Sequence, residues 1–575
     1  MKYLSLKILI FFVIFLSLFV PTNALNETGD TASIASGVVP HHLLAKEILV
    51  DFFKFIAKQK KHPDTVVLLS PDHFNCSALQ KENSFISIDW ETDDVKLDEI
   101  SVNYKLLKEL SISNKIKPNR SSVLAEFGIT NLLPFIKEYL PKTKIIPIIT
   151  PEDISREQIS QLIATIDNIA PSKTLLLASV DFSHYLPPEA AEFHDTKSIR
   201  VLLNCEEDQF ENIEVDSWQS LYAVRLFAKL RKSEKPVIIA HKNSVDFLPY
   251  DLNSTTSYFS VIFQEGEAVE NLQAETILLA GDMMLGRGVD KLMKENSIYY
   301  PFQKIVQLLR GVDIVFANLE GPVLGNLPLF SENALKFAFF PDVLEGVKWS
   351  KINLLSLANN HIMDMEENGF QETIDWLGKY QLNSIGNPLS SYQDNSNPSF
   401  STEHSVFLAF NRILPFINYQ EDIIEEIEKT KLDNPGKIII VSMHWGNEYE
   451  LTCSHVQREL AYKVIAAGAD IIVGHHSHVV QEIELIQGKP VFYSVGNFIF
   501  DQQSFPETRE GLLVGLTIKD DRLSFRLFPI KNQAGQPILM SQGESKIFFD
   551  NLAQKSDKRL WEKIKKGIIE LEMIK

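Results

Sequence analysis

Short apolar runs alternate with amphipathic stretches along the first half of this chain. Buried strands are predicted at residues 65–70 (TVVLLS), 144–150 (KIIPIIT) and 174–179 (TLLLAS), and a helix at 156–169. Strands that alternate with helices predict a mainly parallel sheet whose two faces are both covered. The series ends near Phe263, where FSVIFQ is the last predicted strand.

A second series of the same kind starts at Thr276. The predicted strands are 276–280, 314–317, 354–357, 438–442, 471–473 and 491–495, and the predicted helices are 369–380 and 456–467. The acidic segment 265–275 lacks an apolar pattern and reads as a linker. Because 575 residues exceed one ordinary domain, we expect two α/β domains, at 37–264 and 276–545. Leu560, Ile564 and Ile568 have helical spacing, which predicts an amphipathic helix over 556–575.

The N-terminus has the pattern of an export signal. Lys2 and Lys7 precede the apolar run 8–20, and small residues lead to a cleavage point after Ala24. Residues 1–24 are therefore expected to be a cleaved signal or a retained membrane anchor. We expect an exported protein, secreted or held at the membrane by this segment alone. The three cysteines, Cys76, Cys205 and Cys453, are too scattered for a disulfide framework.

Charge narrows the choice of partner. The formal net charge is −19, and a nucleic-acid backbone requires a basic surface, so nucleic acid is not an expected partner. The hydrophobic fraction of 45% and charged fraction of 23% are ordinary for folded protein.

Polar side chains follow nearly every predicted strand of the second half. The groups are Gly281-Asp282, Asn318-Leu319-Glu320, Asn359-Asn360-His361, His444-Trp445-Gly446 and Gly474-His475-His476-Ser477-His478. In open α/β sheets ligands bind outside the carboxyl ends of the strands. Carboxylate, amide oxygen and imidazole are ligands for divalent ions. The sequence therefore predicts a metal site at this edge of the second sheet.

The same segments carry a family resemblance. GDMMLGR (281–287), ANLEGPV (317–323), LANNHIMD (357–364), HWGNEY (444–449), GHHSHVVQ (474–481) and YSVGNFIFDQ (493–502) resemble the motif series of the CapA family. That family is associated with poly-γ-glutamate capsule synthesis and is similar to calcineurin-like metallophosphoesterases. The resemblance covers about 230 residues and implies a calcineurin-like metallophosphoesterase fold for the second domain.

The resemblance also implies roles for individual residues. His361 would face the substrate as a general acid or charge stabiliser. Apart from the resemblance, Arg287 follows the first ligand closely enough to reach an anionic group of the substrate, and an ordinary surface ion pair is the alternative for this residue. The implied metal ligands are Asp282, Glu320, Asn360, His444, His476 and His478. Manganese, iron or zinc is the expected metal.

The first motif departs from the phosphoesterase pattern. Asp-x-His is replaced by Asp282-Met283-Met284, and Glu320 stands in place of an aspartate. One ligand is therefore missing, and either one tight metal or two unequal metals are expected.

Histidines follow the apolar runs of the first half as well. His41, His73 and His184 lie at or just beyond three of them, and three imidazoles can hold a single transition metal. VVPHH, LLSPDHF, LAEFGITNLLPF, LASVDFSHY and NSVDF resemble the Memo-like family, also known as AmmeMemoRadiSam system protein B. That family shares the fold of class III extradiol dioxygenases, and the resemblance implies that these three histidines bind its metal.

The combined interpretation is an exported, metal-dependent hydrolase or transferase of the CapA type. We expect it to act on an anionic envelope polymer, such as poly-γ-glutamate, or on a phosphoester. Two alternatives stay open: a non-enzymatic scaffold that binds an anionic polymer, and a non-haem-iron oxygenase in the first domain.

Overall fold

The computed structural model describes residues 33–572, except 76–83, 90–94, 115, 251, 269–270, 328–334, 391–396 and 504. The expected signal at 1–24 and Cys76 lie outside the described residues. Within the described part of the chain, no helix has the length and apolar character needed to span a membrane. The chain divides into two compact units. The N-terminal unit comprises the chain up to Asp181 with Asp216–Lys242 and Tyr258–Val269, and the C-terminal unit comprises Phe182–Val215, Asn243–Ser257 and Glu270–Lys575.

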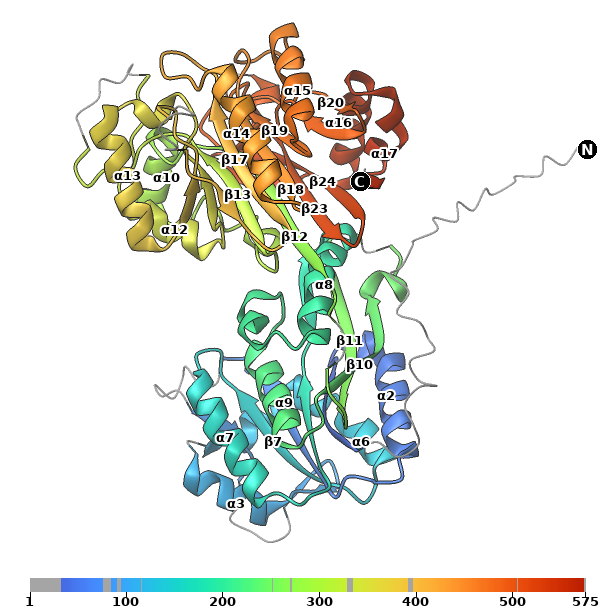
Figure 1. Cartoon of the computed structure of the whole chain (residues 1–575). Coiled ribbons are helices and arrows are strands. Elements are labelled where there is room, and N and C mark those ends of the chain that lie inside the picture. Colours follow the sequence, from blue (N-terminus) through green and yellow to red (C-terminus); the bar gives the residue numbers. More distant parts are fainter. Residues whose placement is uncertain are drawn as a thin grey trace, which may run out of the picture. The chain divides into compact units, whose positions relative to one another are not determined.

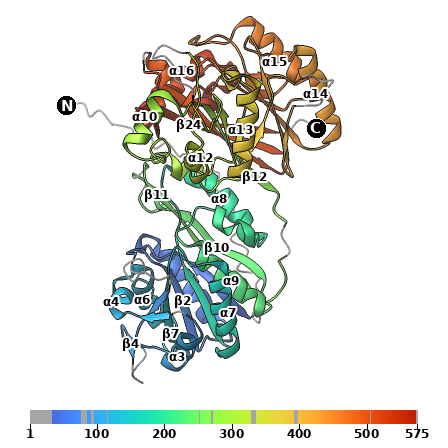
Figure 2. The same ribbon diagram turned by 90° about the vertical axis from the view of Figure 1, so that its left-hand side faces the viewer.

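The N-terminal unit is built on a mixed sheet whose centre is parallel. The central strands are β1 (Ile34–Val39), β8 (Thr174–Ser179), β2 (Thr65–Pro71) and β7 (Lys144–Thr150), paired in that order. The antiparallel β11 (Thr255–Gln264) borders β1. Helices α7 (Arg156–Ile169) and α9 (Trp218–Leu230) lie on one face, and α2 (Lys46–Lys58) and α6 (Leu133–Tyr139) on the other (Figures 1 and 2).

These elements confirm the predicted pattern in the first half. All residues of β2 are buried, as expected of a parallel strand covered on both faces. Helix α7 begins at a capping box formed by Ser155 and Gln158, and it buries Ile159, Leu162 and Ile166 on one face.

The C-terminal unit contains two packed sheets. The first has the order β15 (Asn383–Ile385), β14 (Leu354–Ser356), β13 (Ile314–Leu319), β12 (Ala274–Met283), β23 (Glu510–Lys519), β24 (Arg522–Gln533), β25 (Gln536–Leu539). The second has the order β16 (Phe400–Ser401), β17 (Ser405–Asn411), β18 (Ile438–His444), β19 (Ile471–His475), β21 (Lys489–Phe492), β20 (Ile483–Ile486).

Side-chain alternation along β12 shows how the layers stack. Ile277 and Leu279 join a core with Phe407 and Ile440 of the second sheet. Leu278 points to the opposite face, into a core that includes α10 (Arg287–Glu295), α12 (Val343–Trp349) and α13 (Glu366–Tyr380). Helices α14 (Gln420–Asp433) and α15 (His455–Ala467) cover the outer face of the second sheet (Figure 1). The unit is thus a four-layer arrangement of helices, two sheets and helices, and both domains have the predicted α/β class.

The C-terminal unit also includes a helix that lies inside the range expected for the first domain. Helix α8 (Pro188–Leu203) follows β9 (Phe182–Leu186), and its Phe193 belongs to the same core as Leu278. The Lys197 ammonium donates to the carbonyl oxygen of Val312 at 3.0 Å. A hydrophobic pattern predicts a helix but does not specify which sheet the helix covers.

Two further predictions need correction at the C-terminal end. Residues 556–575 do not form one amphipathic helix: α17 (Trp561–Lys565) is followed by β26 (Ile568–Glu572), which pairs with β24. Gly567 has a φ of +69° between them, a left-handed conformation that ends the helix. The strand expected at 491–495 is β21, which ends at Phe492.

Candidate metal centre

The carboxyl ends of β12, β13 and β19 meet at a buried cluster. Asp282 lies near the end of β12, Glu320 follows β13 directly, and His478 follows β19. One ligand atom from each lies within 4.8 Å of the others. His478 Nδ1 is 3.4 Å from an Asp282 oxygen, and its Nε2 is 3.7 Å from Glu320 Oε1. The predicted convergence of strand ends therefore places two carboxylates and an imidazole together.

The other predicted ligands adjoin this cluster. His444 Nε2 is 2.8 Å from Asn360 Oδ1. This separation suits two ligands of one ion, since neighbouring ligands at about 2.1 Å from a metal lie about 3 Å apart. The His476 ring lies 4.9 Å from the His444 ring, and its backbone N–H donates to Asp282 at 3.1 Å. Asp282, Glu320 and His478 thus form the cluster itself, and Asn360, His444 and His476 adjoin it.

Asn318 links the two halves of the site and was not among the predicted ligands. Its Nδ2 donates to Asp282 Oδ1 at 2.8 Å and lies 3.3 Å from His444 Nδ1. Its Oδ1 accepts from Asn359. Asn318 stands two positions before Glu320 in ANLEG, near the carboxyl end of β13, which is the signal by which the sequence could have identified it.

The burial and hydrogen bonding of Glu320 indicate whether a cation fits this site. The residue is 0% exposed, and neither carboxylate oxygen has a hydrogen-bond partner among the described residues. Burying an unpaired carboxylate is costly, so buried charges are normally paired or coordinate metals. The buried acidic and histidine groups therefore suit a metal ion. His475, the last residue of β19, has Nδ1 3.4 Å from Asp282 Oδ1, beside this second carboxylate.

The loop that carries the histidines is conformationally strained. His476 and His478 have φ angles of +86° and +56°. Non-glycine residues in the left-handed region cost about 1–3 kcal/mol each and concentrate at functional sites. This loop carries the His478 imidazole, which faces Asp282 and Glu320, and the His476 imidazole, which lies beside the His444 ring.

The surroundings shift the pKa values of the two carboxyl groups, Asp282 and Glu320, in opposite directions. Burial alone would raise the pKa of Asp282, but hydrogen bonds and charges from His475 and His478 lower it well below its usual value. Burial, and then the charge of Asp282, raises the pKa of Glu320 to about 7. Burial opposes the charged form of His478, but Glu320 and Asp282 raise its pKa to about 9. Without a cation, Glu320 and His478 therefore both retain protons more strongly than usual.

His361 lies beside this cluster with its ring orientation fixed. Its Nδ1 is 2.8 Å from Asp364 Oδ2, and its ring stacks on Phe337 with 3.9 Å between centroids. An ionised carboxylate only accepts hydrogen bonds, so Nδ1 carries the proton and Nε2 is left as the free acceptor. Asp364 was not among the predicted site residues, although it ends the LANNHIMD segment.

Arg287 is held at the start of α10. It forms an ion pair with Asp501, and its guanidinium lies 4.9 Å from the centre of the Phe337 ring. The side chain is 38% exposed, so part of it remains open to a ligand.

The N-terminal unit has a second cluster, with a different third member from the one predicted. His41, His73 and Asp216 each offer a ligand atom within 4.8 Å of the others. His41 Nε2 is 3.5 Å and His73 Nε2 is 3.9 Å from Asp216 Oδ2. His73 Nδ1 is 2.6 Å from Glu126, which orients the ring. His184 is not a member of this group; it lies in β9, opposite Thr256 of β11.

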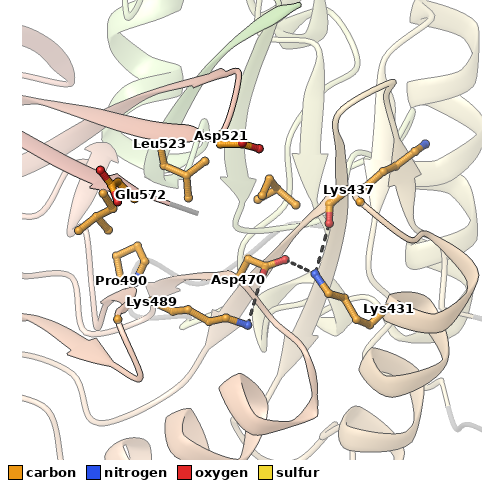
Figure 3. A pocket seen from close by; sticks show the side chains of 12 residues that line it. Lys431, Lys437, Asp470, Lys489, Pro490, Asp521, Leu523 and Glu572 are labelled. Carbon is orange, nitrogen blue, oxygen red and sulfur yellow. Dashed lines mark hydrogen bonds and ion pairs between the residues drawn. The ribbon is translucent and has the colours of Figure 1, made fainter. Parts of the chain in front are cut away.

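A pocket of 440 Å³ lies at the other end of β18 and β19, away from the histidines (Figure 3). Asp470 holds Lys431 at 2.7 Å and Lys489 at 3.0 Å, and it also accepts from the backbone N–H of Ile439. These contacts join the starts of neighbouring strands, which accounts for the ion cluster structurally.

Comparisons with known proteins find a family match in each half of the chain. Residues 276–502 match the family described as bacterial capsule synthesis protein PGA_cap, and residues 19–258 match the Memo-like protein family. The capsule biosynthesis protein CapA of Bacillus anthracis is 28% identical over 315 residues, covering 50% of this chain and 75% of the relative. The PGA biosynthesis protein CapA of Bacillus subtilis strain 168 is 31% identical over 284 residues, covering 45% and 71%.

Two further comparisons concern a Memo-like relative and a solved structure. A MEMO1 family protein of Caldivirga maquilingensis is 24% identical over 257 residues, covering 42% of this chain and 88% of the relative. Purple acid phosphatase PPD1 from yellow lupin aligns with 12% identity over 50% of this chain and 62% of its own, at a TM-score of 0.27. That score is too low to support a statement about function.

Proposed function

This chain belongs to the bacterial capsule synthesis protein family through residues 276–502 and carries a Memo-like region before them, and from this premise we propose that its C-terminal unit is a metal-dependent hydrolase or transferase. The observation that carries the proposal is the buried Glu320 carboxylate, unpartnered among the described residues and within 4.8 Å of Asp282 and His478. We propose manganese, iron or zinc as the ion.

The proposed ligands are those at the strand ends: Asp282, Glu320, Asn360, His444, His476 and His478. A divalent metal held there would make a hydroxide available near neutral pH and polarise the bond under attack. Asn318 orients Asp282 and His444 through its amide N–H groups. His361 presents Nε2, with Asp364 holding Nδ1–H, so the protonated ring can deliver a proton to the leaving group.

The proposed substrate is an anionic polymer of the capsule or envelope, with poly-γ-glutamate first because of what the relatives are named for. A phosphoester is the second choice. We further propose that the chain is exported by its N-terminal segment and works outside the cytoplasm, either released or held at the membrane.

The test uses the purified full chain loaded with manganese and assayed on poly-γ-glutamate and on a phosphodiester. We expect His361→Ala to lower kcat by about 10²–10⁴-fold while metal content stays unchanged. Asp282→Ala should lose both metal and turnover. His455→Ala, on an exposed histidine of α15, is the matched control. Unchanged turnover in both site variants would exclude the enzymatic proposal, and polymer binding without turnover would favour the scaffold.

The N-terminal cluster supports a second candidate function. Two histidines and one carboxylate, His41, His73 and Asp216, form the donor set typical of non-haem iron oxygenases when further positions stay open. Iron loading and oxygen uptake by the full chain, compared with Asp216→Ala, would test this function. Iron content without oxygen uptake would leave only a metal-binding role.

A further inference from the structure

Asn497 lies directly beside the first carboxylate of the metal cluster. It begins β22 (Asn497–Ile499), a short strand that pairs in parallel with β12 and places Asn497 opposite Asp282. The backbone N–H of Asp282 donates to the carbonyl oxygen of Gly496 at 3.1 Å. A Cβ on Gly281 would lie 1.9 Å from that oxygen, so the close approach of the two strands requires glycine there. The Asn497 side chain, 1% exposed, is thereby buried at the cluster.

A backbone carbonyl fixes the orientation of the Asn497 amide. The carbonyl oxygen of Thr508 can only accept a hydrogen bond, and it receives Asn497 Nδ2 at 3.0 Å. The same nitrogen donates to Gln502 Oε1 at 3.2 Å. A flipped amide would set its oxygen against the Thr508 carbonyl. The atom that faces His478 is therefore Oδ1, an acceptor 2.9 Å from Nδ1 of the ring.

This acceptor determines which nitrogen of His478 carries the proton. A neutral imidazole has one N–H donor and one nitrogen with a free lone pair. Because Asn497 Oδ1 can only accept, the proton belongs on Nδ1, and the lone pair is on Nε2. Nε2 lies 3.7 Å from Glu320 Oε1. The hydrogen bond at one ring nitrogen thus leaves the other to bind a cation next to Glu320.

Asp282 offers His478 a second acceptor, at a longer distance. Asp282 Oδ2 lies 3.4 Å from His478 Nδ1, and it also accepts the backbone N–H of His476 at 3.1 Å. Both acceptors favour the same tautomer. Asp282 is itself a proposed metal ligand, whereas Asn497 is neutral and is not one. The Asn497 oxygen is therefore the acceptor that serves His478 alone.

We propose that Asn497 is a positioning residue for the metal, which keeps the His478 proton on Nδ1 and presents Nε2 to the ion. This assignment rests on the proposed metal-dependent function and deepens it, because Asn497 acts on the ion only through His478. An imidazole binds a metal through an unprotonated nitrogen. Without Oδ1, the proton can occupy Nε2 and the ring can turn, and both changes oppose metal binding.

The test measures zinc binding rather than turnover, with the full chain carrying Asp216→Ala to weaken the N-terminal cluster. Zinc affinity is measured by competition with a chelator. Asn497→Ala should weaken zinc binding about 10–100-fold, as for other groups that orient a ligand histidine. Asn497→Asp keeps an oxygen acceptor for Nδ1–H and should recover most of this loss. Asn532→Ala is the matched control, since this buried asparagine donates to the carbonyl oxygen of Phe498 at 3.3 Å, and its zinc affinity should be unchanged.

Nuclear magnetic resonance of the zinc-loaded chain, labelled with ¹⁵N-histidine, reads the tautomer directly. The His478 signals, identified by their loss in His478→Gln, should show a protonated Nδ1 and a zinc-bound Nε2. Zinc bound through Nδ1 would overturn the proposal, and this readout does not depend on the folding of any Asn497 variant.

The affinities separate the remaining outcomes. Unchanged zinc affinity in Asn497→Ala would reject the role of Asn497 and leave the proposed function standing. An equal loss in Asn497→Ala and Asn497→Asp would also reject that role, because the lost Nδ2 donors would then account for the effect. A cluster that binds no zinc in the chain with Asn497 intact would reject the metal site, and the proposed function with it.

Discussion

Glu320 Oε1 faces His478 Nε2 across 3.7 Å, yet neither oxygen of this buried carboxylate has a hydrogen-bond partner among the described residues. Above its raised pKa of about 7 the carboxylate is charged at a net cost, because burial and the charge of Asp282 oppose its ionisation more than the facing His478 favours it. Glu320→Gln should therefore stabilise the metal-free chain at pH 8.5 by about 1–3 kcal/mol, because the buried charge is removed. The same variant should lose the stabilisation that manganese gives the unmodified chain. Thermal unfolding with manganese and with a chelator measures both effects, and a destabilised, metal-responsive variant would contradict them.

Asp364 is expected to act on the reaction only through His361. Asp364→Asn keeps the size of the side chain but removes the carboxylate that fixes the proton on Nδ1. We expect kcat to fall about 10–100-fold, as for other residues that orient a site histidine, with unchanged metal content. Because Phe337 N–H also donates to Asp364, thermal unfolding must accompany the assay. A shifted pH–rate profile would support a positioning role, whereas an unchanged profile would mean that the loss is structural.

Asp313 should make the C-terminal unit sensitive to acid. Burial opposes its charge, but Lys197 and Arg200 lower the pKa of Asp313 to about 2, below its ordinary value of 3.8. A depressed carboxyl pKa contributes stability that is present above the unfolded pKa and is lost as the pH falls through the folded pKa. Stability should therefore decline between about pH 4 and pH 2. Asp313→Asn should cost about 3 kcal/mol at pH 7, because Lys197 is left buried with less compensation, and should flatten the acid decline measured by denaturant unfolding.

Substitution of Phe193 tests whether α8 is part of the C-terminal core. Its side chain is 0% exposed and packs with residues of β12 and β24. Phe193→Ala is expected to destabilise the C-terminal unit by about 3–5 kcal/mol. Phe227, equally buried on α9 of the N-terminal unit, supplies the matched control. Hydrogen exchange resolved by segment should show faster exchange in β12 and β23 for Phe193→Ala only. The same contacts predict that residues 270–575 expressed alone will not fold.

Substitutions of Asp216 and of His184 are expected to have different effects on metal binding in the N-terminal unit. Asp216→Ala should lower the affinity for a metal bound to His41 and His73 by more than the about 10–100-fold that loss of a residue orienting a ligand costs, because it removes one of three ligands. His184→Ala should leave the affinity for this metal unchanged. Elemental analysis of the full chain carrying Glu320→Gln, which removes the other site, measures the N-terminal metal alone. Loss of metal in His184→Ala would restore the ligand set expected from the sequence.

Local patterns predicted many of the regular elements. The strands at 144–150 and 174–179 and the helix at 156–169 have the predicted bounds, because continuous apolar runs and an amphipathic stretch with a capping box reflect short-range preferences. The tail was predicted wrongly because Leu560 and Ile564 do follow a helical repeat, but Gly567 ends it and β24 pairs with the residues that follow.

By itself, the sequence determined the α/β class, the alternation of strands and helices, and the ligand types at the strand ends, since these depend on the order of residues along the chain. Only the tertiary structure decided which groups share a site. Asp216 follows no apolar strand, and α8 gives no sign of the sheet it covers. Likewise, the acceptor that Asn497 presents to His478 depends on an amide orientation set by the backbone carbonyl of Thr508. Such relationships join residues that are distant in the chain, and their energies exist only after the chain has brought the groups within a few ångströms.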